Sequence, residues 1–131
     1  MMKALSIRSD YAMQIMLGQK KVEYRSWQTH YRGPLLICGT AKKVKGGIPG
    51  YAICVACLTN IQHQPDQGQY AWQLAPFGPS GSYWIEPIPI KGHLSLFQVP
   101  DSLIVRVPFF DLETAAARTW FKQKIIPLRN N

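Results

Sequence analysis

The chain has 131 residues, 47% of them hydrophobic, and its 15 Lys and Arg residues against seven Asp and Glu residues give a formal charge of +8. These values exclude a disordered chain and predict a single domain over residues 1–131. No apolar run reaches the roughly 20 residues that cross a bilayer, and the first residues lack a signal peptide's apolar stretch, so we expect a soluble cytoplasmic protein without membrane contact. The charge favours anionic partners such as RNA or nucleotides; a basic surface that serves solubility alone is the alternative.

The first predicted elements are a strand over residues 3–8 and a helix over residues 11–17. Ser9 or Asp10 is expected to cap the helix, and Gly18 stands where a glycine commonly ends one. The apolar stripe of the helix is Ala12, Ile15 and Met16.

A second strand, over residues 21–27, alternates in character. Because neighbouring side chains of a strand point to opposite faces, one face carries Lys21, Glu23, Arg25 and Trp27. The other face carries Val22, Tyr24 and Ser26. After Gly33 and Pro34, residues 35–38 predict a buried strand.

The middle of the chain predicts further strands separated by loops. Residues 39–50 form a loop rich in glycine and lysine, and residues 51–58 form the longest strand, which we expect to be central. Residues 62–69 are polar and predict a turn. The remaining strands are predicted at residues 70–74, 83–91, 95–98 and 103–107, with a plain loop at 77–82.

Two features complete the predicted fold. Pro87 and Pro89 place residues 83–91 at a sheet edge or a bend, because proline cannot donate to a ladder. Residues 111–124 predict a C-terminal helix capped by Asp111. Many short strands with few helices predict an α+β, mainly β fold of the closed or partly closed barrel type.

The three cysteines predict no disulfide and no metal site. Cys54 and Cys57 have the C-x-x-C spacing, but they lie in a predicted strand, where residues three apart point to opposite faces roughly 10 Å from each other. That geometry excludes a mutual disulfide or a shared zinc ion. We therefore expect inert, buried thiols and no cofactor, apart from a divalent cation if the protein is a nuclease.

The pattern that carries a family resemblance begins at the N-terminus. It consists of Lys3-Ala4-Leu5-Ser6-Ile7-Arg8, Tyr11, Gly18-x-Lys20-x-x-Glu23-x-Arg25 and Trp27. Matching segments follow at Arg32 to Ile37, at Trp72-x-Leu74 and at Ile85 to Gly92. This pattern closely resembles the ASCH domain, whose hallmark is G-x-K-x-x-E-x-R after the first helix.

The resemblance implies a PUA-like small β-barrel with a short helix after the first strand and a C-terminal helix. It also implies that the corner between the first helix and the next strand lines a cleft. The family is associated with recognition of RNA or modified nucleosides, and some members are reported as hydrolases or nucleases. RNA, a nucleoside or a nucleotide is therefore the expected partner, and the oligomeric state stays open.

The motif also has a physical interpretation that does not depend on the resemblance. Gly18 permits the reversal from helix to strand, and Lys20 lies at the mouth of that reversal. Glu23 and Arg25 share a strand face, and a carboxylate within about 4–6 Å of two cations is held ionised. It can accept from the edge of a base or activate a water molecule, while the cations suit a phosphate or carbonyl oxygen. An exposed ion pair of little consequence is the alternative.

Four further residues are candidate ligand-binding groups. Ser6 and Arg8 lie on the strand that leads into the first helix, and Lys91 follows a strand stiffened by proline. Trp27 shares the Glu23 face and offers a stacking surface for a base, with core packing as the alternative. The loop lysines Lys42, Lys43 and Lys45 either follow a phosphate backbone or belong to a solvated turn.

The resemblance also limits the chemistry. A known branch of the family hydrolyses the amide of an acylated cytidine with a lysine equivalent to Lys20 and a threonine at the position of Glu23. Covalent threonine chemistry is therefore excluded here. The alternative to a binding module is a ribonuclease or nucleoside amidohydrolase with Glu23 as base and Lys20 as charge stabiliser. Whether Glu86 joins the cleft stays open, and a protein-interaction module is a third hypothesis that no specific residue supports.

Overall fold

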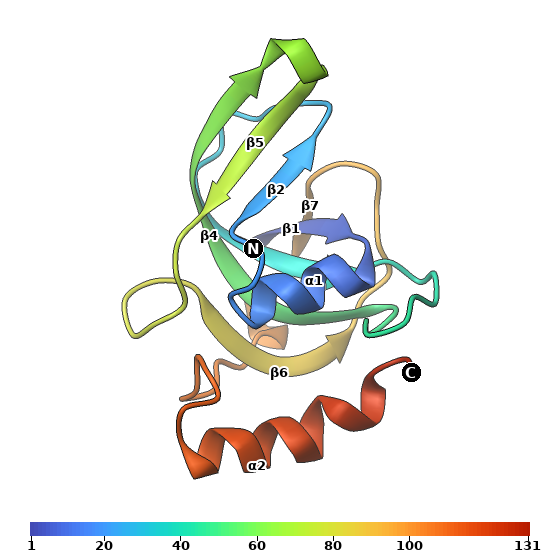
Figure 1. Cartoon of the computed structure of the whole chain (residues 1–131), viewed down its shortest axis with the longest axis vertical. Coiled ribbons are helices and arrows are strands. Elements are labelled where there is room, and N and C mark those ends of the chain that lie inside the picture. Colours follow the sequence, from blue (N-terminus) through green and yellow to red (C-terminus); the bar gives the residue numbers. More distant parts are fainter.

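The computed structural model describes residues 1–131 as one seven-stranded sheet with two α-helices (Figure 1). The strands are β1 (Met2–Ile7), β2 (Val22–Arg25), β3 (Gly33–Gly39), β4 (Tyr51–Gln64), β5 (Gln69–Leu74), β6 (Tyr83–Pro89) and β7 (Phe97–Val99). The helices are α1 (Ser9–Met16) and α2 (Ala115–Lys124). Neither has the length and apolar character that a membrane crossing requires.

The strands are ordered β2-β5-β4-β3-β1-β7, and β6 pairs with β4 beside this path. β1 and β3 run parallel, and every other pair is antiparallel. The α+β, mainly β class is therefore confirmed, and β4 is the central strand as expected. The path of paired strands does not return to its start, so the sheet is not closed into a barrel.

β4 is longer than predicted because it continues through polar residues into a projecting hairpin with β5. Residues 59–64 are mostly exposed, so their polarity is compatible with a strand that faces solvent. The predicted turn at 62–69 is therefore wrong in its first half. The chain reverses only at the short 3-10 turn Pro65–Gln67 and at Gly68, whose φ of 61° is left-handed. Figure 1 shows this hairpin and β2 extending together from the rest of the sheet.

Two apolar clusters occupy opposite faces of the sheet. Along β1, Ala4 belongs to the smaller cluster and Leu5 to the larger one, as strand alternation requires. The larger cluster contains Trp72 and Trp84, both fully buried. The indole of Trp84 donates to the carbonyl oxygen of Met16 at 2.8 Å and therefore fixes the end of α1 against the sheet. Such buried indoles are expected to have a hydrogen-bond partner.

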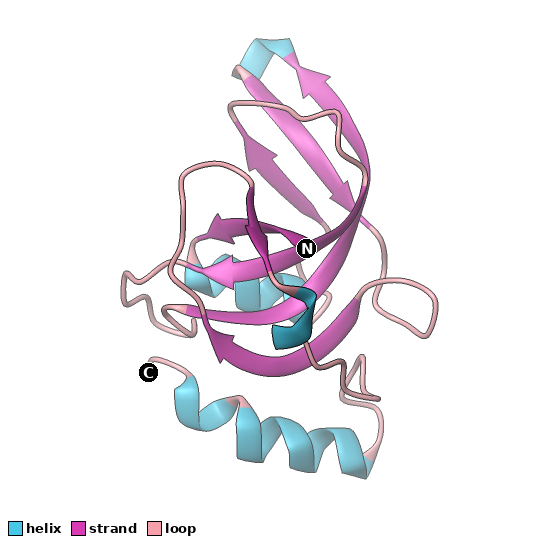
Figure 2. Cartoon of the chain, turned by 180° about the vertical axis from the view of Figure 1, so that it is seen from behind, coloured by secondary structure: helices cyan, strands magenta, loops and turns pink.

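α2 covers the sheet beside β6, at the end of the molecule away from the β4–β5 hairpin (Figures 1 and 2). Trp120 of α2 stacks on Trp84 with ring centroids 5.7 Å apart. Ala117 and Phe121 are buried under the same helix. This packing explains why a helix with a modest apolar face is stable at this position.

The expected cap of α1 is wrong. The helix begins at Ser9 itself, with Arg8 at the N-cap position and no side-chain cap. The Asp10 carboxylate binds the Nε of Arg8 at 2.8 Å instead, so the local ion pair replaces the cap.

The expected cap of α2 is also wrong. Thr114 is the N-cap, and its hydroxyl accepts from the amide of Ala117 at 3.1 Å. Asp111 accepts from the amide of Glu113 at 3.0 Å and forms a turn before the helix. The preceding predicted strand at 103–107 is a 3-10 turn, Asp101–Leu103, followed by a single bridge between Arg106 and Ile85. The amides of Glu86 and Val107 donate to the carbonyl oxygens of Val105 and Trp84 on either side of this bridge, at 2.9 and 3.0 Å, and the pairing extends no further.

The cysteines are all free. Cys38 and Cys54 are buried, and burial raises the pKa of the Cys38 thiol to about 12 and that of Cys54 further still. Cys57 is half-buried rather than buried, and burial raises its pKa as well. Reactivity depends on the thiolate, and the raised pKa values disfavour the thiolate form of all three cysteines.

Candidate functional site

The corner between α1 and β2 places the motif residues. Gly18 has a φ of 75°, a left-handed conformation that favours glycine, and nothing lies within 4 Å of the position that its Cβ would occupy. The amides of Gln19 and Lys20 both donate to the carbonyl oxygen of Gln14, at 2.8 and 3.1 Å. These bonds close the corner and direct the chain into β2, so the position of Lys20 is fixed by the backbone.

Glu23 lies between two cations. Its Oε1 is 3.5 Å from the Nζ of Lys20, and its Oε2 is 3.8 Å from Nη1 of Arg25. The amide of Tyr24 also donates to Oε1, at 3.2 Å. β2 pairs with β5 alone and is an edge strand. The Glu23 carboxylate therefore accepts a hydrogen bond from a backbone amide on a strand that has no second neighbouring strand. The structure thus brings together the three side chains that the sequence motif singles out.

Burial dominates the ionisation of this carboxylate. Glu23 is 5% exposed, and its desolvation raises its pKa above the ordinary value even though Lys20 and Arg25 each lower it. The two cations act in the expected direction and favour the ionised form, but the desolvation of Glu23, which we did not expect, outweighs them. The sequence shows the charges around Glu23 but not how far the fold removes it from water.

Two exposed tyrosines flank Lys20. Its Nζ lies 5.1 Å from the ring centroid of Tyr11 and 5.5 Å from that of Tyr24. The tyrosines are 38% and 45% exposed. Arg8 joins the same group because its guanidinium lies 4.9 Å from the Tyr11 ring. Sequence reasoning missed both tyrosines as site residues, because Tyr24 is on the opposite strand face and Tyr11 is on a different element.

Trp27 is mainly a packing residue. Its ring meets that of Trp72 edge to face, with centroids 4.9 Å apart, and its carbonyl oxygen accepts from the Trp72 indole at 3.2 Å. The guanidinium of Arg25 lies 5.6 Å from the Trp27 ring. Trp27 therefore supports Arg25 while it covers the core.

Ser6 and Lys91 lie in a different place from Glu23. They line a pocket of about 350 Å³ between the end of β1, the loop that follows β3 and the loop that follows β6. The Oγ of Ser6 accepts from the amide of His93 at 3.2 Å. Glu86 is also elsewhere: its Oε1 accepts from the Trp120 indole at 3.3 Å, on the side that α2 covers.

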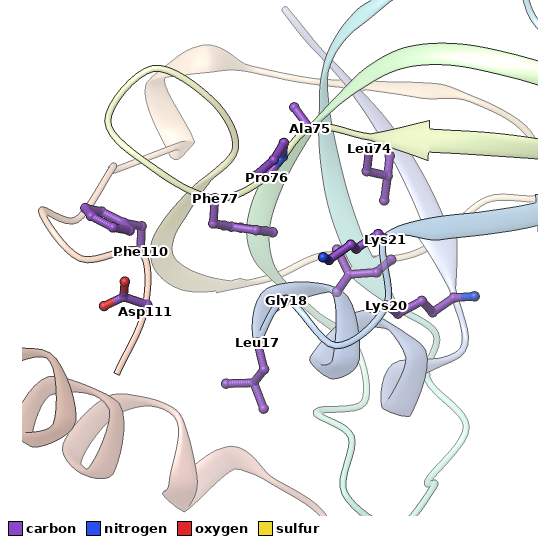
Figure 3. Close-up of a pocket in the computed structure, with 11 residues that line it drawn as sticks. Leu17, Gly18, Lys20, Lys21, Leu74, Ala75, Pro76, Phe77, Phe110 and Asp111 are labelled. Carbon is purple, nitrogen blue, oxygen red and sulfur yellow. The ribbon is translucent and has the colours of Figure 1, made fainter. Parts of the chain in front are cut away.

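A second cavity, of about 170 Å³, adjoins the corner on the side of α2 (Figure 3). Its walls are mainly apolar, and they include Leu74, Phe77 and Phe110. Figure 3 shows the amine of Lys20 directed away from these aromatic rings. Neither Glu23 nor Arg25 lines any of the four pockets of the chain, so the predicted cleft around them is not shown.

The comparison with known families covers this whole region. The family model described as the ASCH domain matches residues 5–90. The chain belongs to the ASCH domain family. The match extends from β1 to the end of β6, so it contains the Lys20, Glu23 and Arg25 positions, and α2 lies beyond it. A comparison with curated proteins gives no match.

Membership in the ASCH family is consistent with RNA recognition in general. The geometry adds what this particular ASCH domain offers: a buried carboxylate with two neighbouring cations and two exposed aromatic rings. No group of three or more His, Cys, Asp or Glu side chains in the chain is arranged to hold a metal ion, so we assign no metal ligands.

The raised pKa of Glu23 predicts how its replacement changes stability. Between the unfolded and folded pKa values the native state binds more protons, so this group's contribution to the free energy of unfolding falls as pH rises through that interval. We expect Glu23→Gln to melt at the same or a higher temperature than wild type at pH 7.5. The difference should shrink below pH about 4, where both states of wild type are protonated at this group.

Thermal melts of both proteins between pH 3.5 and 8 measure this effect. Asp66→Asn, on the exposed 3-10 turn of the hairpin, is the control for removing one negative charge. A lower melting temperature of Glu23→Gln at pH 7.5 would show that the cation contacts outweigh the burial.

Proposed function

We propose that this ASCH domain recognises RNA or a modified nucleoside at the site formed by Lys20, Glu23 and Arg25. The observation that carries the proposal is the buried Glu23 carboxylate held between two cations next to exposed aromatic rings. A base presents donors on its edge, a flat surface for stacking and a nearby phosphate. The carboxylate, the tyrosine rings and the cations match these three features respectively.

The contacts of Glu23 leave hydrogen-bond donors of both cations available to a ligand. Charge-assisted hydrogen bonds are usually about 2.7–2.9 Å long. The contacts of Glu23 with Lys20 and Arg25, at 3.5 and 3.8 Å, are longer than that. Both cations therefore keep donors for an incoming phosphate or carbonyl oxygen. Arg25 can offer two parallel donors from its planar guanidinium, which Lys20 cannot.

A hydrolase at the same site is the second candidate function. Burial raises the pKa of Glu23, and a general base is most effective when its pKa approaches the working pH. Lys20, 3.5 Å away, would stabilise negative charge that develops on the substrate. The hydrolase would be either a nucleoside amidohydrolase or a ribonuclease.

Two structural assignments accompany the proposed function. We propose that residues 1–131 act as a single ASCH domain, and that its arrangement corresponds to the PUA-like barrel type despite the open path of paired strands. The predicted partner remains RNA, a nucleoside or a nucleotide.

A screen of ligands tests the proposal. The four ribonucleosides, acylated cytidines and short RNAs are added to wild type and to Tyr24→Ala, with melting temperature measured and products sought by mass spectrometry. Because stacking on an aromatic ring contributes about 1–3 kcal/mol per base, we expect Tyr24→Ala to weaken binding roughly 5- to 150-fold. Leu103→Ala, a replacement of an equally exposed apolar side chain (47%), is the control.

The screen also separates the two functions. RNA binding that weakens steeply with salt and leaves the ligand unchanged supports recognition. Product that forms with wild type and disappears in Glu23→Gln supports the hydrolase. Binding that ignores salt, or no binding to any of these ligands, contradicts the recognition proposal.

A further inference from the structure

We propose that the pocket lined by Ser6, Thr40, Lys91 and His93 is a second subsite, which takes a phosphate and the adjoining nucleotide of an RNA strand. The inference rests on the proposed function, because the base of the first nucleotide would occupy the Lys20, Glu23 and Arg25 site. It narrows the substrate class: the preferred ligand is an oligonucleotide of at least two nucleotides rather than a free nucleoside.

The pocket has the size and the groups for this role. Its volume is about 350 Å³, and no acidic side chain lines it. Ser6 is 7% exposed, and its Oγ accepts from the His93 amide at 3.2 Å. A hydroxyl that accepts one bond keeps its own proton to donate. The pocket therefore offers a fixed hydroxyl donor next to the ammonium group of Lys91, both suited to a phosphate oxygen.

The surrounding charge is positive and unpaired. Lys91 is exposed, and Lys42, Lys43 and Lys45 are exposed on the loop that contributes Thr40 to the pocket. None of the four lysines takes part in any of the salt bridges of the chain. Cations without an intramolecular partner exchange their counterions for phosphates on binding. The loop lysines are therefore placed to follow the strand beyond the pocket.

The rim of the pocket carries apolar surface for a base. Leu94 is 96% exposed, an unusual state for a leucine, and it lines the pocket together with His93. The His93 ring packs against the Phe97 ring, with centroids 4.6 Å apart, and this contact holds the orientation of the His93 ring. A bare phosphate would not need these side chains, whereas a nucleotide would contact them through its base and ribose.

A continuous series of residues joins this pocket to the first site. Ser6 and Arg8 are two residues apart in extended backbone, which spaces them by roughly 6–7 Å. Arg8 lies 4.9 Å from the Tyr11 ring, and Lys20 lies 5.1 Å from the same ring. The one acidic side chain on this path, Asp10, is already bound to Arg8 at 2.8 Å. An RNA strand laid along this path meets donors at each step.

The wall of the pocket is held in place before any ligand binds. The amide of Thr40 donates to the carbonyl oxygen of Ile7 at 2.8 Å, which ties the loop after β3 to β1. At the other end of that loop, the amide of Gly46 donates to the carbonyl oxygen of Asn130 at 2.6 Å. The opposite wall approaches closely too, since a Cβ on Gly92 would lie 2.5 Å from the Ser6 Oγ. A preformed wall lowers the ordering cost of binding.

The test compares ligands that differ by a single added nucleotide. Affinities are measured for uridine, cytidine and adenosine, for their 5′-monophosphates, and for the matching dinucleotides and fluorescein-labelled hexanucleotides. We expect dinucleotides to bind wild type at least tenfold more tightly than nucleosides. Lys91→Ala should remove most of that difference, leave nucleoside affinity unchanged and reduce the salt slope for the hexanucleotide by about one. Lys122→Ala removes the same charge from an exposed position on α2. It should change neither the preference for dinucleotides nor the salt slope.

The outcomes distinguish the two proposals. Equal affinity for nucleosides and dinucleotides in wild type, or a Lys91→Ala variant that behaves like Lys122→Ala, overturns the second subsite while the first site stands. Absence of binding by every ligand, or a Lys20→Ala variant that binds all of them as wild type does, overturns both.

Discussion

Lys20→Ala is expected to weaken the binding of short RNA roughly 10- to 100-fold, because a hydrogen bond to a charged group contributes about 1.5–3 kcal/mol. The Lys20 side chain contacts the Glu23 carboxylate and lies near the Tyr11 and Tyr24 rings. These groups are the proposed ligand contacts, so one substitution removes a donor and loosens the arrangement of the others. Fluorescence anisotropy with labelled hexanucleotides measures the loss.

The fold should survive this substitution. Lys20 makes its structural hydrogen bond through its backbone amide, which donates to Gln14 at 3.1 Å and is retained in alanine. At pH 7.5 Lys20→Ala is expected to remain folded but to melt at a lower temperature than wild type, because the buried Glu23 carboxylate loses one of its two cations. Lys21→Ala is the matched control, since it removes the same charge from the next residue, which is exposed and makes no ion pair with Glu23 and no cation–π contact with Tyr11 or Tyr24. An equal loss of affinity in Lys21→Ala would mean that net charge alone decides binding.

Gly47→Ala is expected to lower the free energy of unfolding by about 3 kcal/mol, at the upper end of what overpacking usually costs. A Cβ at this position would lie 2.5 Å from the carbonyl carbon of Ser9 and 2.6 Å from the amide nitrogen of Asp10, and it would overlap the Ser9 hydroxyl. Backbone atoms cannot rotate away as a flexible side chain can. The loop after β3 or the start of α1 must therefore shift, and the hydrogen bond from the Asn130 amide to Gly47, at 2.7 Å, is disturbed as well.

Urea unfolding of Gly47→Ala and wild type measures this cost. Gly78→Ala is the control, because Gly78 also lies in a loop, has no left-handed φ and has nothing within 4 Å of its Cβ position. We expect Gly78→Ala to be as stable as wild type. Wild-type stability in Gly47→Ala would show that the loop moves freely and that the pocket wall is not preformed.

The sequence by itself determined the parts of this protein that depend on short-range rules. Gly18 ends a helix where a left-handed residue is needed, and strand alternation places Glu23 and Arg25 on one face. Residues 5–90 carry enough of the pattern to identify the ASCH family. The apolar character and length of the predicted strand at residues 51–58 also indicated that it is central in the sheet. The helix end, the strand face and the position of the strand depend on residues within a few positions of one another, and the family depends on motifs read in order along the chain. None of them required knowledge of the fold.

The tertiary structure alone decided how these parts meet. The packing of α1 against the sheet brings Tyr11 close to Lys20. Burial raises the pKa of Glu23, although its two neighbouring cations lower it. Ser6 lies apart from Glu23, in a pocket where its hydroxyl accepts from the amide of His93, 87 residues further along the chain. The helix caps are a different case, because the ion pair and the turn that take up Asp10 and Asp111 join residues only two positions apart. Long-range packing sets distance and solvent access, and local sequence rules contain neither.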